Sequence, residues 1–181
     1  MIGATLTIDL ERLPLGENAP EVVNMVVEVP VGSRNKYEYD ADLGVIMRDR
    51  VLPGSVRYPL DYGFLPSTAG DDGRPLDVLL AAYDPVFPGC VVQGRPIGVL
   101  VMRDANGMDR KIYAVPDDDP RFADIRTITS IPDNNLREIE QFLQVYKRLE
   151  GDQDVEIHEW LGPKEAHEII RKASQSLLEL E

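Results

Sequence analysis

The stretch "VVNMVVEVP", residues 22–30, indicates the fold class of this 181-residue chain. Five of its nine residues are valine, and β-branched side chains favour the extended conformation of a strand. Proline at position 30 ends the run, because proline cannot donate a backbone hydrogen bond to a sheet. We therefore expect a β-strand here, the first of several in the chain.

Six further strand candidates follow, separated by glycine, proline and aspartate. Many short strands at this spacing favour a closed barrel over an open parallel sheet. Residues 1–21, which contain Pro14, Gly16 and Pro20, are expected to form an N-terminal arm. The six candidates cover residues 36–39, 44–50, 62–65, 77–81, 91–102 with a break at Pro96, and 111–115.

The C-terminal third has a different pattern. Residues 133–151 carry apolar side chains at helical spacing, so we expect a helix with Asp133 as its N-cap and Gly151 at its end. A second helix is expected from Pro163, which suits a first-turn position, to about Leu178.

Between these helices, residues 154–160 ("DVEIHEW") alternate like a strand. Strand candidates therefore dominate the first two thirds of the chain, and two helices follow late. The sequence predicts a single domain over residues 1–181, with an α+β arrangement around one barrel.

Composition argues against several classes of function. The chain has 32 acidic and 19 basic residues, a formal net charge of −13, so its surface repels nucleic acids and anionic membranes. Its single cysteine, Cys90, cannot form an internal disulfide. The N-terminus has no signal-peptide pattern, and no apolar run approaches the ~20 residues of a membrane span. We therefore expect a cytoplasmic protein without nucleic-acid or membrane partners.

Two acidic clusters beside strand candidates indicate a metal site. The first is "DDGRPLD", residues 71–77, and the second is "RDANGMDRK", residues 103–111. Carboxylates that are held close together repel one another unless a cation neutralises them. A third acidic run, residues 117–119, lies between two prolines and is expected to be a solvated surface.

Other site chemistries have little support. The clusters lack the ligand spacing of an EF-hand. The two histidines, His158 and His167, lie far from Cys90, which argues against a zinc site and against a Ser-His-Asp or Cys-His mechanism. No glycine-rich phosphate loop of the P-loop or Rossmann type is present.

Cationic and phenolic side chains accompany the acids. Taken singly, each is more often a surface charge or a packed tyrosine. Together with the aspartates they describe a site in which carboxylates hold Mg²⁺ while cations and phenols hold phosphate oxygens. That combination suits metal-assisted transfer of a phosphoryl group to water. These side chains are Lys36, Arg50, Tyr58, Tyr62, Lys111, Tyr146 and Lys147.

The order of several motifs resembles that of the soluble family I inorganic pyrophosphatases, from about Val22 to the C-terminal helix. Collinear motifs over nearly the whole chain are more specific than any single one of them. The matching pieces are "VVEVP", "NKYEYD", "DRVLPGSVRYPLDYGF", "DGRPLDVLL", "PIGVL", "DANGMDRKIYAVP" and "YKRLEG".

The resemblance implies a small five-stranded closed β-barrel of OB-like form with flanking C-terminal α-helices. It implies hydrolysis of pyrophosphate to two phosphates with Mg²⁺, for which Mn²⁺, Co²⁺ or Zn²⁺ could substitute. It also implies a homo-oligomer, a hexamer or smaller.

The resemblance further assigns roles to individual residues. The metal ligands are Asp72, Asp77, Asp104 and Asp109. These aspartates, with Arg50, Tyr62 and Lys111, form the expected catalytic group. The phosphate ligands are Lys36, Arg50, Tyr62, Lys111, Tyr146 and Lys147, and Glu28 and Glu38 have supporting roles.

One residue departs from the family pattern. The family signature is Asp-Gly-Asp-Pro-x-Asp, and its middle aspartate helps to hold and deprotonate a water that bridges two metal ions. This chain has Arg74 at that position. A positive charge beside a metal site repels the cation. At an effective dielectric of ~20 and a separation of ~4 Å, each unit-charge pair is worth about 4 kcal/mol. This value is an upper bound, because the long side chain can swing outward or toward a phosphate.

Three hypotheses follow from Arg74. In the first, Asp61, which stands where the family usually has asparagine, or Asp71 replaces the lost carboxylate. In the second, the enzyme is slow and uses fewer metal ions or another phosphoanhydride. In the third, the chain is a weakened or inactive relative that binds phosphate or pyrophosphate. An Mg²⁺-dependent pyrophosphatase is the leading hypothesis.

Overall fold

The computed structural model of the chain describes residues 8–151 and 155–180. The strands are β1 (Val23–Val29), β2 (Asn35–Asp40), β3 (Val45–Val51), β4 (Asp61–Leu65), β5 (Leu76–Leu80), β6 (Val91–Asp104), β7 (Gly107–Pro116) and β8 (Glu156–Leu161). The helices are α1 (Asp133–Leu149) and α2 (Pro163–Leu180), with short 3₁₀ turns at Leu10–Arg12, Pro120–Phe122 and Ile128–Ser130. All strands and both helices expected from the sequence are present.

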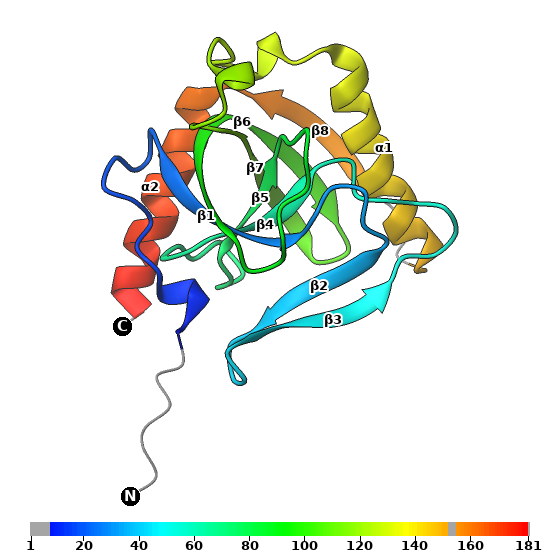
Figure 1. Cartoon of the computed structure of the whole chain (residues 1–181), viewed down its shortest axis with the longest axis horizontal. Helices are drawn as coiled ribbons and strands as arrows, with labels where there is room; N and C mark the ends of the chain where they lie inside the picture. Colours follow the sequence, from blue (N-terminus) through cyan, green and yellow to red (C-terminus); the bar gives the residue numbers. More distant parts are fainter. Residues whose placement is uncertain (1–7, 152–154, 181) are drawn as a thin grey trace, which may run out of the picture.

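Five strands form a ring in the order β1-β4-β5-β7-β6, and β6 pairs back onto β1 (Figure 1). The β5–β7 pairing is parallel, whereas the other pairings of the ring are antiparallel. The β1–β6 contact comprises four residue pairs, from Val23↔Gly94 to Val26↔Val91. β8 extends the sheet beyond β6, and β2 and β3 form a separate hairpin. The predicted α+β fold with a five-stranded ring is therefore confirmed.

Close packing between β1 and β4 depends on Gly63. A Cβ atom at this position would lie 1.9 Å from the carbonyl oxygen of Val26 on β1, which no side chain can tolerate. Glycine thus lets the two backbones approach just beside Tyr62.

Alternating side chains divide the hydrophobic core into two clusters. One cluster takes residues from all five strands of the ring and includes Ala166, Ile170 and Ala173 of α2. The other lies against α1, whose Ile139, Phe142, Leu143 and Tyr146 pack on the opposite face of β5, β6 and β7. In β7, for example, Ile112 belongs to the first cluster and Tyr113 to the second. Both faces of these strands are therefore buried.

Two local expectations are wrong. β6 runs unbroken through Pro96, because a bulge between Pro96 and Gly98 absorbs the missing hydrogen bond. Asp133 is not the N-cap of α1: Pro132 holds that position without a side-chain hydrogen bond, and Asp133 lies in the first turn. An acidic residue there still interacts favourably with the helix dipole. Gly151 follows the helix with φ +96°, as expected of a residue just beyond a helix end.

The N-terminal arm lies against the ring over its described part. The backbone N–H of Ser67 donates to the carbonyl of Glu11 at 2.7 Å, and that of Asn24 donates to Leu15 at 2.7 Å. Residues 1–7 of the expected arm, and Asp154 of the expected strand, lie outside the described residues. Within residues 8–151 and 155–180, no helix is both long and apolar enough to cross a membrane.

Candidate active site

A cavity of about 1030 Å³ opens where the ring, the β2–β3 hairpin and both helices meet. It collects side chains that lie far apart in the sequence. All residues that the resemblance assigned to the site line this cavity, whereas Asp61, the hypothetical replacement for the lost carboxylate, does not. They are Glu28, Lys36, Glu38, Arg50, Tyr62, Asp72, Asp77, Asp104, Asp109, Lys111, Tyr146 and Lys147.

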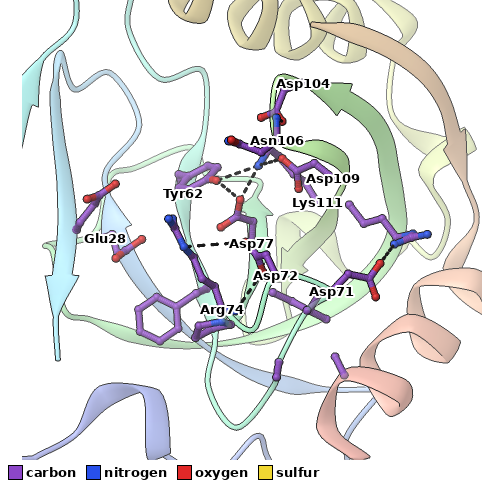
Figure 2. A pocket seen from close by; sticks show the side chains of 18 of the residues that line it. Glu28, Tyr62, Asp71, Asp72, Arg74, Asp77, Asp104, Asn106, Asp109 and Lys111 are labelled. Carbon is purple, nitrogen blue, oxygen red and sulfur yellow. Dashed lines mark hydrogen bonds and ion pairs between the residues drawn. The ribbon is translucent and has the colours of Figure 1, made fainter. Parts of the chain in front are cut away.

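Lys111 is the centre of the deepest group (Figure 2). Its Nζ lies 2.5 Å from Asp77 Oδ2, 2.9 Å from Asp109 Oδ2 and 3.1 Å from the Tyr62 hydroxyl. The Tyr62 hydroxyl also donates to Asp77 Oδ2 at 2.5 Å. One ammonium group therefore joins two aspartates and a phenol.

Strand register produces this contact. Val78 on β5 pairs with Ile112 on β7, so the preceding residues, Asp77 and Lys111, are neighbours on the same face. Asp109 lies two residues before Lys111 and shares that face, because strand side chains alternate.

The charges within the group stabilise one another. Burial would lower the pKa of Lys111, but the charges of Asp77 and Asp109 outweigh it and hold that pKa well above its usual value. Burial would raise the pKa of Asp77, but the charge and hydrogen bonds of Lys111 and Tyr62 lower it. Burial and the Asp77 charge raise the pKa of Tyr62 well above its usual value. At neutral pH Lys111 is therefore an ammonium, Asp77 a carboxylate and Tyr62 a neutral phenol.

Asp104 lies at the end of β6 and is paired with Lys147 from the last turn of α1. Its other oxygen accepts from the backbone N–H of Asn106 at 2.8 Å, which fixes the β6–β7 turn. Burial would raise the pKa of Asp104, but the hydrogen bonds from Lys147 and Asn106 lower it. The two side chains are only 9% and 14% exposed, so solvent weakens this pair little.

The β2–β3 hairpin supplies the cations on the opposite wall. Lys36 and Arg50 are register partners across the hairpin. Arg50 makes a bidentate pair with Glu150, both contacts at 2.7 Å, and Lys36 contacts Glu38. Asp49 contacts Arg50 and lies 3.6 Å from Lys36. The Arg50–Glu150 pair fastens the hairpin to the end of α1.

Two further side chains complete the walls. Glu28 on β1 accepts from the backbone N–H of Tyr39 at 2.7 Å, and burial raises its pKa to about 7. Tyr146 on α1 stacks on Phe142 with ring centroids 5.0 Å apart, and burial raises its pKa to about 12. Both side chains are therefore held in place by their neighbours.

Arg74 and Asp72 lie on the loop between β4 and β5. The backbone N–H of Arg74 donates to Asp72 Oδ1 at 3.1 Å, and its carbonyl accepts from Gly70 at 2.7 Å. Gly73 adopts φ +80°, which allows the tight turn. The Arg74 side chain lines the cavity, is 83% exposed and has its Nε 4.0 Å from Asp72 Oδ2. Figure 2 shows it extending from the loop toward the interior of the cavity.

Asp61 lies elsewhere. It precedes Tyr62 on β4, so its side chain is on the opposite face of the strand. It is fully buried beside a second cavity of about 790 Å³, with Cys90 among the lining residues. Its Oδ1 accepts from the backbone N–H of Val31 at 2.7 Å, and burial raises its pKa to about 6. Asp61 therefore does not replace a carboxylate in the first cavity.

Asp71, the other candidate replacement, does line the first cavity. It contacts Arg110 at 2.8 Å and is 67% exposed, so it lies at the rim. Figure 2 shows its carboxylate turned away from the group around Lys111.

Several residues of the site were not predicted. Asp49 and Glu150 hold the hairpin cations, and Glu11 and Lys172 line the cavity from the N-terminal arm and α2. Asp49 lies next to the predicted Arg50 in the sequence, which was the available signal, whereas Glu150 is one hundred residues from Arg50. Glu11 and Lys172 have no local signal, because only the tertiary fold brings the arm and α2 to the cavity.

The four aspartates suit a hard divalent cation, because carboxylate oxygens are the donors that Mg²⁺ prefers. Asp77 and Asp109 converge, since both contact the ammonium of Lys111. Among the described residues, no three acidic, histidine or cysteine side chains lie close enough to hold one ion as they stand. For three or more of these aspartates to coordinate one metal ion, their side chains must rotate.

Known proteins resemble this chain closely. A family model described as inorganic pyrophosphatase matches residues 25–178. A Thermus thermophilus protein named inorganic pyrophosphatase is 48% identical over 165 residues, covering 90% of this chain and 94% of the relative. One of the same name from a Nostoc species is 43% identical over 170 residues, covering 94% and 98%. The crystal structure of inorganic pyrophosphatase from Thermus thermophilus superimposes with a TM-score of 0.92 at 45% identity, covering 94% of this chain and 99% of that one.

Proposed function

The chain belongs to the inorganic pyrophosphatase family and is an enzyme that hydrolyses pyrophosphate, and we propose that Mg²⁺ is the ion with which it does so. In this reaction water attacks one phosphorus atom, the bridging P–O bond breaks, and two phosphates leave. The alternative of a phosphate-binding protein without catalysis is not favoured, because the relatives carry the name of the enzyme.

The contacts of Lys111 carry this proposal. A buried ammonium that is bound to two aspartates and a tyrosine brings anion-binding and cation-binding groups into one cavity. Phosphate oxygens bind to cationic and phenolic donors through charge-assisted hydrogen bonds. The proposed phosphate ligands are Lys36, Arg50, Tyr62, Lys111, Tyr146 and Lys147.

The proposed metal ligands are Asp72, Asp77, Asp104 and Asp109, which line the same cavity. A bound Mg²⁺ supplies a water of lowered pKa and neutralises charge on the leaving phosphate. Mn²⁺, Co²⁺ and Zn²⁺ are proposed as substitutes. Lys111 lowers the pKa of Asp77 and Lys147 lowers that of Asp104, which favours the ionised form that binds cations.

Glu28 and Glu38 have supporting roles in this proposal. Glu28 fixes the end of β2, beside the hairpin turn, through the backbone of Tyr39. Glu38 contacts Lys36 and thereby orients its ammonium group. Asp61 is left out of the catalytic group, because its side chain lies on the other face of β4.

We further propose a cytoplasmic homo-oligomer, a hexamer or smaller, that does not bind nucleic acid or membranes. The net charge of −13 supports the absence of polyanionic partners. The exposed apolar side chains of Tyr83, Phe87 and Val91, 63%, 70% and 44% exposed, support association between subunits. Cys90, the single cysteine, fits a reducing compartment.

Release of phosphate from pyrophosphate tests the function. We expect turnover with Mg²⁺ and none with EDTA, and we expect Asp77→Asn to lower kcat/KM at least 100-fold. Asp124→Asn, an exposed aspartate outside the cavity, is the matched control and retains activity. Failure to release phosphate with any of Mg²⁺, Mn²⁺, Co²⁺ and Zn²⁺ would contradict the proposal.

A further inference from the structure

Arg74 differs in its contacts from all the other cations of the cavity except Lys172, for which the described residues likewise show no carboxylate contact. Five of the six other lysines and arginines that line the cavity contact a carboxylate oxygen at 2.8 Å or less. The nearest carboxylate to Arg74 is that of Asp72, 4.0 Å away. Within the part of the chain that the structure describes, the Arg74 guanidinium donates no hydrogen bond. Its five N–H donors are thus available to a ligand.

The base of this side chain is fixed although its head is exposed. The backbone N–H and carbonyl of Arg74 are both hydrogen-bonded, to Asp72 and Gly70. Pro75 follows with a restricted φ. The backbone N–H of Ala69 donates to the carbonyl of Ala173 at 2.9 Å, which ties this loop to α2. The guanidinium therefore moves about a fixed point on the rim of the cavity.

We propose that Arg74 is a substrate-binding residue, whose guanidinium binds oxygens of one phosphate group of pyrophosphate at the rim of the cavity. This inference rests on the proposed function for the nature of its ligand. It adds to the site a positive charge that belongs to the protein and does not depend on a metal ion.

The chemistry of the two groups supports this role. The planar guanidinium matches two phosphate oxygens at once, which an ammonium cannot do. When Arg74 binds a phosphate, little stabilisation is lost from its pair with Asp72. That pair is long and exposed, and such pairs contribute little in water. Arg110, by contrast, must break a 2.8 Å contact with Asp71 before it can bind a ligand.

Calorimetric titration of pyrophosphate into the full chain in excess EDTA tests the role without turnover. We expect measurable binding by the wild type and a loss of roughly 10- to 100-fold in affinity for Arg74→Gln, the usual range for one charged hydrogen-bonding group. Arg74→Lys should retain only part of the wild-type affinity for pyrophosphate, because lysine cannot make the bidentate contact. Arg110→Gln is the matched control, an arginine on the same rim, and should change the affinity less than threefold.

The result that overturns the inference is an affinity of Arg74→Gln within twofold of wild type, or wild type that does not bind pyrophosphate in EDTA. Thermal unfolding shows whether the variant is folded. We expect no loss of folding, because the Arg74 side chain is 83% exposed. Failure of the proposed function is a separate result. In that case wild type binds pyrophosphate and Arg74→Gln weakens binding, but no divalent ion yields phosphate.

Discussion

Lys111 on β7 and Asp77 on β5 contact each other at 2.5 Å across the parallel pair of strands in the ring. The Lys111 side chain is 4% exposed and also contacts Asp109. The same ammonium therefore belongs both to the proposed phosphate site and to the electrostatic balance of the fold.

Replacing Lys111 by methionine tests this double role. Two aspartates then lose their cation, so we expect a loss of about 1–3 kcal/mol in the free energy of unfolding, less than for a fully buried pair because both aspartates are partly exposed. Activity should fall at least 100-fold. Urea unfolding and a phosphate-release assay measure the two effects. Lys164→Met is the control, because this lysine of α2 is 81% exposed and lies outside the cavity. Unchanged stability would mean that the aspartates find solvent or another cation.

The stability of the fold should depend on pH through Asp61. Its pKa is raised from 3.8 to about 6, so its contribution to stability is fully present below pH 3.8 and is lost as pH rises through about 6. Asp61→Asn removes this ionisation. We expect the variant to be more stable than wild type by on the order of 2 kcal/mol at pH 8, with the difference shrinking toward pH 4.

Urea unfolding at pH 4.5 and at pH 8 measures this change, and Asp124→Asn provides the matched control. A difference between Asp61→Asn and wild type that is the same at both pH values would show that Asp61 does not titrate in this range. Because Asp61 lies outside the first cavity, the variant should keep its kcat within about twofold of wild type.

Glu150 should act as a positioning residue for Arg50. It holds the guanidinium with two 2.7 Å contacts from the end of α1. In Glu150→Gln the pair loses its charge, and we expect KM for pyrophosphate to rise about three- to tenfold with kcat little changed. Steady-state kinetics separate the two constants. Glu156→Gln, which is 67% exposed on β8, is the control. A fall in kcat with unchanged KM would instead indicate that Arg50 acts mainly in the transition state.

Arg74→Asp should change the two kinetic constants in the same direction. The substitution places a carboxylate on the rim at the position where the resemblance implies one, so kcat with Mg²⁺ should rise. It also removes the proposed phosphate ligand, so KM should rise by roughly tenfold or more. Initial rates over a range of pyrophosphate concentrations give both values. A lower kcat would show that the arginine takes part in the reaction step itself.

Much of the fold was predictable, because its signals are local. Valine-rich and alternating stretches gave β1 and the short strands, and helical spacing gave α1 and α2. The parallel β5–β7 pairing was not predictable in the same way, since residues such as Val78 and Ile112 meet only through tertiary structure. Pro96 was expected to break β6, and the bulge that accommodates it depends on the neighbouring strand.

The sequence predicted which residues form the site better than it predicted which of them contact one another. Acidic clusters beside strands indicated Asp77 and Asp109, and the resemblance indicated the cations. The position of Asp61 could have been inferred from alternation along β4, because a residue adjacent to Tyr62 must face the other way. The partner of Arg50 could not be inferred, because Glu150 is one hundred residues away in the sequence.

The parallel pairing of β5 with β7 also bears on how the chain folds. β4–β5 and β6–β7 are antiparallel pairs of strands that follow one another in the sequence, so each can form from local contacts. Joining them requires a pairing between distant segments, which is intrinsically slow because the intervening chain must first lose entropy. Tyr62 and Asp77 arrive on one pair, and Asp109 and Lys111 on the other. During refolding, helix and hairpin signals should therefore precede the return of pyrophosphate hydrolysis, which awaits the docking of these two halves.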